Sequence, residues 1–241
     1  MLIYETCSAV EVELEWEEDL WTLHADANQA KARLDDRLSL IIEKVLRRLN
    51  YEGHYEIVMC LSDTENFRKK ILPSYKANRA DKRKPVCYAA VVEWVKANYD
   101  TRQYPTLEAD DCVGIMMTRK GAHAVSVSGD KDFMSIPGKF FNHLTDVLKT
   151  ISEEEANYRH LYQTLVGDTA DNYKGCPSYG DVTARKLLDK TPTWQAVKEA
   201  FESKGLTAED ALVQARVARI LRASDWDFKK KCPKLWTPRK E

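Results

Sequence analysis

The spacing of hydrophobic residues predicts helix at the start of the chain. From Leu2 to about Asn50, apolar residues recur every three or four positions and no proline interrupts them. The pattern is clearest between residues 30 and 49, where one stripe carries Leu34, Leu38, Ile41, Ile42 and Val45. On this interpretation Trp16 and Trp21 are core anchors, and the acidic residues 11–19 form a solvated helix face or a partner site.

Strand and helix patterns alternate in the next part of the chain. Residues 55–61 form an apolar run that predicts a buried strand, and residues 123–128 predict a second, shorter strand. Between them, residues 88–99 and 107–118 have helical spacing. This order favours an α/β fold, in which helices cover a mostly parallel sheet.

The predicted secondary structure changes near residue 150. From there to the end we expect helices and short turns without a convincing strand. We therefore expect two domains, an α/β core over residues 1–150 and a helical region over residues 151–241. No apolar run is long enough to cross a bilayer and no basic-then-apolar leader follows Met1, so the expected location is the cytoplasm. The six cysteines form no C-x-x-C pair, which argues against a zinc site and a disulfide framework.

A formal net charge of −1 hides strongly charged segments. Residues 11–19 carry six acids and no base, whereas residues 68–84 carry eight bases and one acid. Another six bases lie between residues 229 and 240. A polyanion responds to such local fields rather than to the net charge.

Acidic side chains gather in four short segments near expected strand ends and helix starts. Each alone has a plainer explanation as a helix cap or a first-turn acid. Together they would repel one another without cations between them, and the ends of parallel strands meet at one edge of a sheet. Oxygen ligands without His or Cys favour Mg²⁺ or Mn²⁺, and two such ions can hydrolyse a phosphodiester. The eight candidate metal ligands are Asp63, Glu108, Asp110, Asp111, Asp130, Asp132, Asp168 and Asp171.

Two further segments carry features of nucleic-acid binding. In the basic stretch, Lys76 and Arg79 lie one helical turn apart, and apolar residues and Tyr75 interleave with the bases. Basic side chains that contact phosphates and aromatic rings that stack on nucleobases are typical of a channel for single-stranded nucleic acid, although a solvated surface helix has a similar composition. Gly175 and Gly180 bracket a turn before a helix, where backbone N–H groups could approach a phosphate.

Taken together, these segments resemble the flap endonuclease family of structure-specific 5′-nucleases, and especially its short-tailed-phage 5′→3′ exonuclease branch. The matching text is LSDTENFRKKILPSYKANR, LEADD, SVSGDKDF and LVGDTADNYKGCPSYGDVTARKLL, with a weaker match at ARVARILRASDWDF. The resemblance spans nearly the whole chain. It implies a PIN-like α/β nuclease core, a helical arch over about residues 64–86 and a helix–three-turn–helix DNA-binding module.

The resemblance also implies a role for each matching residue. Glu108, Asp110, Asp111 and Asp130 would hold a first metal ion with Asp63 beside it, and Asp132, Asp168 and Asp171 would serve a second, partly through water. Asp63, Lys76 and Arg79 would act in catalysis, with the two bases touching the scissile phosphate. The implied DNA contacts are Arg68, Lys69, Tyr75, Lys76, Arg79, Gly175, Ser178, Gly180 and Arg185.

One feature departs from the family pattern. Family members begin with a strand that ends in Asp-x-Asp and supplies a metal ligand, whereas residues 1–9 match the helix that follows it. Either the recorded chain starts at an internal methionine of a working enzyme, or the protein is a shortened variant that binds junctions and cleaves poorly. We favour the first, because deleting an interior strand is costly.

The expected function is therefore metal-dependent hydrolysis of DNA at 5′ ends or 5′ flaps, with RNA paired to DNA as a further substrate. The expected cofactor is a pair of Mg²⁺ or Mn²⁺ ions, and the expected state is a monomer that binds DNA but no membrane. Two alternatives are a catalytically impaired junction-binding protein and a PIN-type ribonuclease acting on free RNA. The sequence does not identify a replication protein that docks on the chain.

Overall fold

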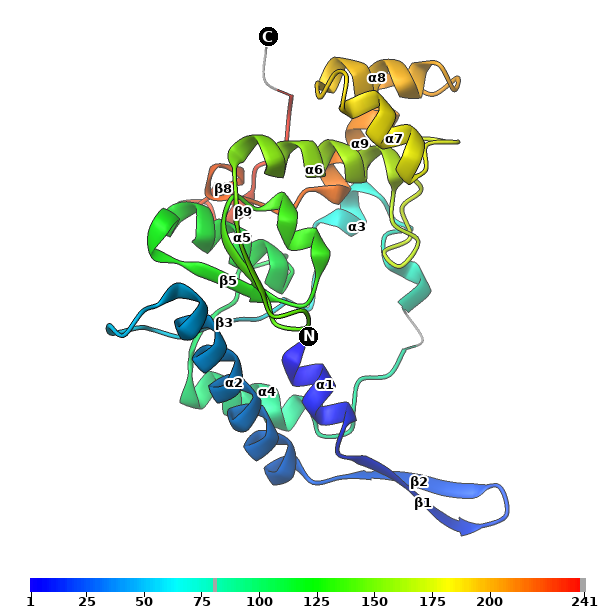
Figure 1. The fold of residues 1–241 in the computed structure, drawn as a ribbon. Helices are drawn as coiled ribbons and strands as arrows, with labels where there is room; N and C mark the ends of the chain where they lie inside the picture. The colour runs from blue at the N-terminus through cyan, green and yellow to red at the C-terminus, as the bar shows by residue number, and fades with distance from the viewer. Residues whose placement is uncertain (80–81, 239–241) are drawn as a thin grey trace. The chain divides into compact units, whose positions relative to one another are not determined.

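A computed structural model describes residues 1–79 and 82–238 (Figure 1). Residues 80 and 81 of the expected arch, and the last two bases of the tail, lie outside these ranges. The contacts divide the chain into two compact units. Unit 1 comprises Met1–Met59, Lys82–Arg102 and Phe141–Leu148, and unit 2 comprises Cys60–Asp81, Gln103–Phe140 and Lys149–Glu241. The units interleave along the chain, whereas we expected one division near residue 150.

The start of unit 1 contains a β-hairpin inside the region where we expected continuous helix. Helix α1 (Leu2–Ser8) is followed by strands β1 (Glu11–Glu17) and β2 (Leu20–Ala25), and then by helix α2 (Ala27–Leu49). The helix prediction is correct at both ends and wrong in the middle. Val12, Leu14 and Trp16 alternate with acids, which is the period of a strand, and Asp19 turns the chain with a φ of 63°.

The prediction that Trp16 and Trp21 anchor a core is also wrong. Their side chains are 63% and 54% exposed on the hairpin. In Figure 1 the hairpin projects beyond α1 and α2, the two helices that flank it in sequence. The expectation failed because an amphipathic strand without a covering layer leaves its large residues in water.

Helix α2 organises the core of unit 1. Asp26 caps its first turn by accepting a hydrogen bond from the Asn28 N–H at 2.8 Å, and Asn50 ends it in a left-handed conformation. Its buried stripe, including Leu34 and Leu38, packs with α1 and with α4 (Tyr88–Asn98). The predicted helix at 88–99 is thus confirmed.

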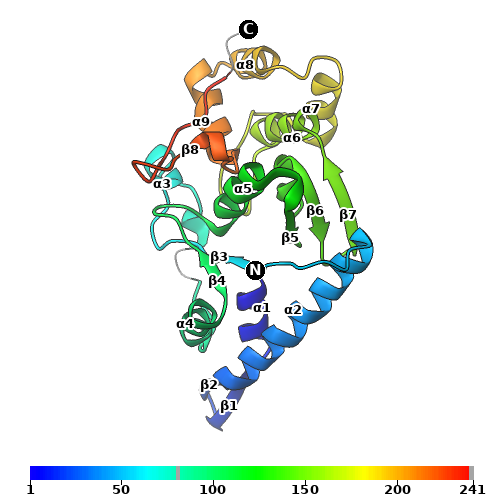
Figure 2. The ribbon, with the colours of Figure 1, turned by 90° about the vertical axis from the view of Figure 1, so that its left-hand side faces the viewer.

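Strand β3 (Val58–Cys60) is shorter than the expected strand at 55–61 and pairs with β4 (Asp100–Arg102), which we did not predict. The predicted helix at 107–118 corresponds to α5 (Ala109–Lys120), and the predicted strand at 123–128 to β5 (Val125–Ser128). Strand β5 belongs to a three-stranded sheet with β6 (Gly138–Asn142) and β7 (Val147–Ile151), in the order β5-β6-β7 (Figure 2).

The described strands form four small sheets of two or three strands rather than one mostly parallel sheet. The hairpin pairs antiparallel, and so do β8 (Trp226–Asp227) and β9 (Cys232–Pro233), which lie in the region where we expected no strand. Short 3-10 helices at Gly121–His123, Lys131–Ser135 and Ala223–Asp225 connect the elements of unit 2. The fold is therefore mixed α/β with short strands.

The second half of unit 2 is mainly helical, as expected. Helices α6 (Glu153–Val166), α7 (Asp181–Leu188), α8 (Trp194–Glu202) and α9 (Ala208–Ala218) gather at one end of this unit (Figure 2). Leu165, Leu188, Val197 and Phe201 form a fully buried core between them. At about 25 cal/mol per Å² of buried apolar surface, such side chains stabilise this part by roughly 2 kcal/mol each.

The loop between α6 and α7 is held by two glycines. A side chain on Gly175 would lie 2.4 Å from the backbone of Gly167 and of Leu165, and both glycines have positive φ. Only glycine allows the two chain segments to approach this closely. The loop therefore has a fixed path that brings residues 168–171 back toward α6.

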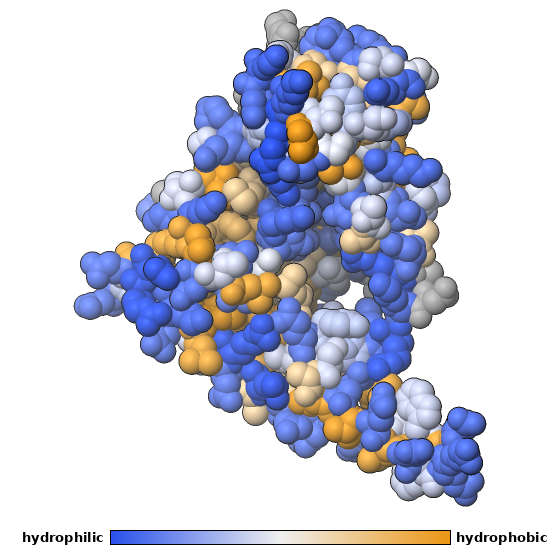
Figure 3. Space-filling view, turned by 45° about the vertical axis from the view of Figure 1, so that its right-hand side comes forward, coloured by the Kyte–Doolittle hydropathy of each residue, from blue (hydrophilic) through white to orange (hydrophobic). Residues whose placement is uncertain are grey.

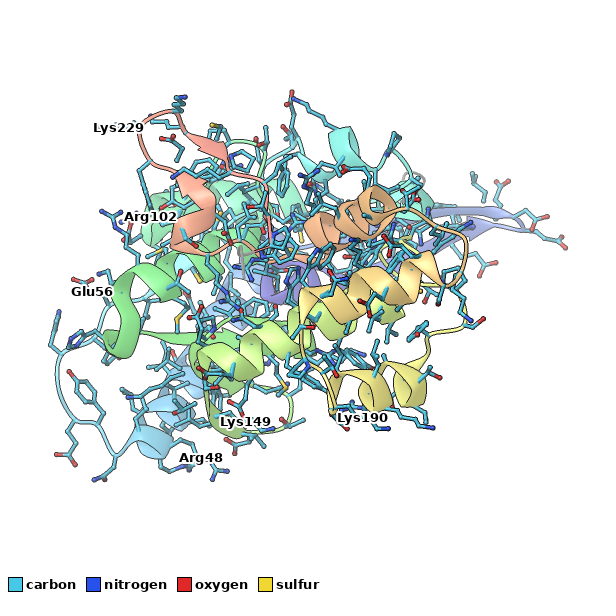
Figure 4. The ribbon with its side chains drawn as sticks, turned by 90° about the horizontal axis from the view of Figure 1, so that it is seen from above. Arg48, Glu56, Arg102, Lys149, Lys190 and Lys229 are labelled. Carbon is cyan, nitrogen blue, oxygen red and sulfur yellow. The ribbon has the colours of Figure 1, made fainter. Side chains whose placement is uncertain are left out.

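Basic side chains extend from the periphery of unit 2. In Figure 4 Lys190, which follows α7, and Lys229, in the turn between β8 and β9, both point outward. No helix within residues 1–79 and 82–238 is long and apolar enough to span a bilayer.

Candidate metal centre

A cavity of about 120 Å³ in unit 2 brings together five of the eight predicted metal ligands. Glu108 and Asp110 come from the start of α5, Asp130 and Asp132 from the loop after β5, and Asp171 from the loop after α6. The basic segment before residue 80 closes the cavity with α3 (Arg68–Ile71), the 3-10 helix Ala77–Arg79 and the chain between them. The acids that the sequence placed near strand ends and helix starts thus converge.

The cavity holds carboxylates that burial and mutual repulsion make hard to ionise. Burial, then the charges of Glu108 and Asp130, raise the pKa of Asp110 from 3.8 to about 7. Burial and Asp130 likewise raise the pKa of Asp132 to about 6, against the opposing effect of Arg159. Such pKa shifts are typical of functional clefts in which buried carboxylates lack a compensating positive charge.

Glu108 is stabilised in the opposite direction by neighbouring bases. Although burial alone would raise its pKa, Arg68 and Lys76 lower the pKa of Glu108 to about 2. The Lys76 ammonium donates a short hydrogen bond to one oxygen of Glu108, and the Tyr75 hydroxyl donates to the other at 2.8 Å. The neighbouring bases therefore favour the ionised form of Glu108.

Three side chains of the same basic segment lie against the Asp171 carboxylate. Arg79 Nη2 lies 2.6 Å from Asp171 Oδ1, while the Tyr75 hydroxyl and Lys76 Nζ lie 3.0 and 3.4 Å from Oδ2. Lys76 itself adopts a positive φ of 53°, and its N–H donates to the Asp171 carbonyl at 2.8 Å. The two bases assigned to catalysis are thus held at the acid cluster by both backbone and side chains.

Arg68 and Asp111 form a buried pair instead of facing the cavity together. Two guanidinium N–H groups of Arg68 donate to the two oxygens of Asp111 at 2.7 Å. Arg68 also donates to the carbonyls of Val217 and Arg219 and, at 3.3 Å, to Glu108. Asp111 also accepts from the Leu221 N–H at 3.0 Å, and it is fully buried. These bonds use both oxygens of Asp111 in holding the core of unit 2.

This burial changes two expected roles. The Arg68 side chain is 3% exposed and its guanidinium is bonded to Asp111, so the structure gives no support to the expectation that Arg68 contacts DNA. Tyr75 is also 3% exposed, and its ring is not available to stack on a base. Both residues instead orient the acids, Arg68 through Asp111 and Glu108, and Tyr75 through Glu108 and Asp171.

Two other predicted ligands lie outside the first cavity. The Asp63 carboxylate accepts the N–H groups of Thr64 and Thr106 at 2.8 and 2.7 Å, which lowers its pKa, and it does not line the cavity. Asp168 accepts the N–H groups of Ala170 and Asp171 at 2.7 and 3.2 Å. Asp63 therefore braces the chain before α5, and Asp168 shapes its own loop.

A second cavity, of about 400 Å³, lies next to the first and shares Asp132 with it. Asp168 lines this cavity, together with Arg159, whose Nη2 lies 3.4 Å from Asp132 Oδ1. Two guanidinium groups, those of Arg159 and Arg185, lie 4.8 and 5.0 Å from the centre of the Tyr162 ring. Asp132 thus lines both cavities, whereas Asp171 lines the first and Asp168 the second.

The remaining DNA candidates are mostly accessible. Lys69, Ser178 and Gly180 are exposed, and so is Arg185, which pairs with Asp181 at 2.7 Å. A side chain at Gly180 would meet nothing within 4 Å, so a ligand could approach the backbone there. Gly175 is different, because its N–H donates to Gln214 Oε1 at 2.9 Å inside the protein.

The donor set suits a hard divalent cation. Within residues 1–79 and 82–238, no three Asp, Glu, His or Cys side chains surround one point as a ready-made metal site. Protein cations lie among the acids instead, with Lys76 between Glu108 and Asp171. An ammonium in that position marks where positive charge is favourable, and the oxygen-only ligands match Mg²⁺ or Mn²⁺.

Sequence reasoning missed Arg159, Tyr162, Gln163 and Tyr173 as lining residues. They lie on or after α6, where their helical spacing is indistinguishable from that of core residues. The weak signal was their position before or directly after GDTADN, the motif that supplies Asp168 and Asp171.

The chain resembles known nucleases in sequence and in fold. Residues 29–163 match the family model of the 5′-3′ exonuclease, N-terminal resolvase-like domain. The chain is 30% identical to the exodeoxyribonuclease of Enterobacteria phage T3, over 99% of this chain and 90% of that protein. It is also 30% identical to the exonuclease of Escherichia phage T7, over 98% and 91%.

Two solved structures show the same fold at low sequence identity. The T5 D15 protein co-crystallized with metal ions superimposes with a TM-score of 0.62 and 13% identity, covering 79% of this chain and 81% of that one. A complex of the bacteriophage T5 D15 flap endonuclease with DNA and metal ions gives a TM-score of 0.57 and 14% identity, covering 80% of each chain. The protein therefore belongs to the 5′-3′ exonuclease family.

Proposed function

We propose that this 5′-3′ exonuclease hydrolyses DNA at 5′ ends and 5′ flaps in the acid-lined cavity of unit 2, with two divalent metal ions. The observation that supports this most directly is the convergence of five carboxylates with Lys76 and Arg79 in one cavity. A site that combines oxygen ligands with phosphate-binding cations is suited to phosphodiester hydrolysis.

The residues that face the cavities divide into two ligand groups. Glu108, Asp110 and Asp130 would hold one ion, and Asp132, Asp168 and Asp171 would hold the other, partly through water. When bound, the ions supply a water nucleophile and stabilise the leaving oxygen. Asp63 and Asp111 support these groups, because their oxygens are used by backbone N–H groups and by Arg68.

The protein's own bases would bind and orient the phosphate. Lys76 Nζ and the Arg79 guanidinium line the cavity directly and are partly accessible to solvent. A scissile phosphate beside them would receive charge-assisted hydrogen bonds, and Tyr75 would keep Glu108 and Asp171 in place. No side-chain nucleophile is required.

The rest of unit 2 supports binding of duplex next to the cleaved end. Helices α6 and α7 with their connecting turn have the order of a helix–three-turn–helix module, and exposed Ser178, Gly180 and Arg185 are its proposed contacts. We further propose that the fold is the PIN-like type, that residues 64–86 act as the arch, and that RNA paired to DNA is also cut. The match to phage exonucleases supports a role in phage-type replication or recombination.

The decisive experiment is cleavage of 5′-labelled flap, nicked and blunt DNA with Mg²⁺ or with EDTA. We expect Mg²⁺-dependent cleavage that is lost in Asp130→Ala and retained in Asp36→Ala, the matched change at an exposed acid of α2. Isothermal titration with Mn²⁺ should show weaker binding to Asp130→Ala. Cleavage that persists in EDTA, or in Asp130→Ala, would refute the proposal, and binding without cleavage at high Mg²⁺ and Mn²⁺ would show a junction-binding protein.

A further inference from the structure

Strand β1 of the β1–β2 hairpin in unit 1 has two chemically different faces. The strand register pairs Leu14 with Thr22 and Glu15 with Trp21, so neighbouring positions on β1 face opposite sides. Val12, Leu14 and Trp16 share one side and are 51%, 41% and 63% exposed. Acidic side chains from alternate positions of β1 lie on the other side, where their paired positions on β2 are Leu23 and Trp21. The strand β1 thus presents an apolar stripe and an acidic stripe to solvent. In Figure 3 hydrophobic and hydrophilic side chains both lie on the surface of the arm at the lower right.

A two-stranded hairpin of this kind is incomplete as a structural unit. An isolated pair of strands is marginally stable in water, and it normally needs a third strand or a helix against its apolar face. Among the residues that the structure describes, β1 and β2 form a sheet of their own without a third strand. The outer edge of β1 is therefore free to hydrogen-bond another chain.

The base of the hairpin is fixed within unit 1. The two oxygens of Glu11 accept two N–H groups of Arg83, each at 2.8 Å, and Glu11 also accepts the Val86 N–H at 2.6 Å. A bidentate pair of this type holds the strand in one direction. The free edge of β1 therefore belongs to a hairpin whose base is anchored to the rest of unit 1.

The charges on β1 select the partner. Among the described residues, none of the five acids at positions 13, 15, 17, 18 and 19 forms an ion pair. Such a cluster repels a DNA backbone, and it also repels a second copy of itself, because like charges opposite each other destabilise a strand pair. Both faces of β1 are complemented by a strand of another kind. This strand places basic residues opposite the acids and apolar residues opposite Val12, Leu14 and Trp16.

We propose that β1 binds an extended segment of a partner protein in which basic and apolar residues alternate, and that this segment adds to the hairpin as a third strand. Strand addition of this kind takes its affinity from main-chain hydrogen bonds and its specificity from alternate side chains. The site is separate from the nuclease cavity and does not depend on the proposed chemistry.

The test uses three fluorescent nonapeptides and the intact protein. One alternates lysine with valine, one alternates glutamate with valine, and the third has the lysines and valines of the first in two blocks. Fluorescence anisotropy should show binding of the alternating lysine–valine peptide and at least tenfold weaker binding of the other two. Leu14→Ser should weaken binding by about tenfold, the sum of two or three cross-strand pairs. The exposed apolar change Leu40→Ser on α2 should leave it unchanged.

A charge exchange makes the test specific. The double variant Glu13→Lys/Glu15→Lys should lose the lysine–valine peptide and gain the glutamate–valine peptide, and circular dichroism will confirm that it is folded. Equal binding of the alternating and block peptides, or binding unaffected by the hairpin variants, would overturn the proposal. So would weaker binding of nicked DNA by Trp16→Ser, which would make the hairpin a DNA contact, or loss of a dimer in that variant by analytical ultracentrifugation.

Discussion

Replacing Asp110 by asparagine should stabilise the metal-free protein while removing a proposed metal ligand. Burial and the carboxylates of Glu108 and Asp130 raise the pKa of Asp110 from 3.8 to about 7. The folded protein therefore holds a proton that the unfolded chain releases at lower pH. As the pH rises from about 4 to about 7, the free energy of unfolding falls, and above that range the full penalty of the ionised carboxylate is present.

The size of the effect follows from the same pKa. The difference between 3.8 and about 7 corresponds to a ceiling of about 4 kcal/mol, at about 1.4 kcal/mol per pH unit. Asp110 is partly exposed, so solvent screens the repulsion, and we expect a gain of about 1–2 kcal/mol for Asp110→Asn at pH 8. For a chain of this length that raises Tm by roughly 2–8 °C.

The assay is urea or thermal unfolding in EDTA between pH 5 and pH 8.5. The advantage of Asp110→Asn should grow with pH across this range, whereas Asp36→Asn, at an exposed position of α2, should show no such growth. Adding Mg²⁺ should stabilise the unchanged protein more than the variant. A pH-independent difference, or a variant that is less stable at pH 8, would refute the charge-repulsion argument.

Three further changes test other parts of the site. Lys76→Ala should reduce cleavage and lower the salt dependence of DNA binding by about 0.7–0.9 in log–log slope; an unchanged slope would place the side chain away from phosphate. Arg68→Ala should lower the free energy of unfolding in urea by about 3–5 kcal/mol, because it leaves the Asp111 carboxylate buried without its partner. The double variant Arg68→Met/Asp111→Leu should recover most of that loss. A loss below about 1 kcal/mol in Arg68→Ala would contradict the buried pair. Gly175→Ala should destabilise by about 1–3 kcal/mol, because φ is +65° and backbone atoms lie 2.4 Å from the new Cβ, whereas Gly180→Ala should be near neutral; equal thermal shifts would count against the loop crossing.

The acids of the cavity could be found from the sequence because each has a simple local position. Asp130 and Asp132 follow a strand, Glu108 and Asp110 begin a helix, and Asp171 lies in a loop after a helix. Polar side chains at such positions converge in α/β folds. The prediction depended on local pattern and on where element ends meet, and both can be read from one sequence.

The division of labour between neighbours could not be found in this way. Asp110 and Asp111 are adjacent on α5, and successive helical residues point about 100° apart. One faces the cavity and the other is buried against Arg68, and only the packing of the chain decides which. The same holds for Arg68 and Lys69, of which the first is enclosed and the second exposed.

The hairpin was missed for a related reason. Its strands are short, helices flank them on both sides, and its turn at Glu18-Asp19 lacks the Asn-Gly or Gly pair that usually marks a two-residue hairpin loop. The alternation of Val12, Leu14 and Trp16 with acids was present but was averaged into a longer helical window. Its apolar side chains are exposed, although hydrophobic residues of this size are normally buried, and the sequence alone does not show that they lack a covering layer.

The charges around the cavity give a reason to expect that DNA binding there depends on cations. Five carboxylates and the three basic groups of Arg68, Lys76 and Arg79 line it, which gives a formal charge of −2 when all are ionised. A phosphodiester adds another negative charge and would be repelled, even though Lys76 and Arg79 are placed to bind it. The two divalent cations of our proposal would reverse the sign, so that the carboxylates that repel DNA in isolation would hold it through the metal ions. Lys76 and Arg79 alone therefore do not make the cavity a phosphate-binding site. The raised pKa values of Asp110 and Asp132 reflect the negative charge that the metal ions would compensate.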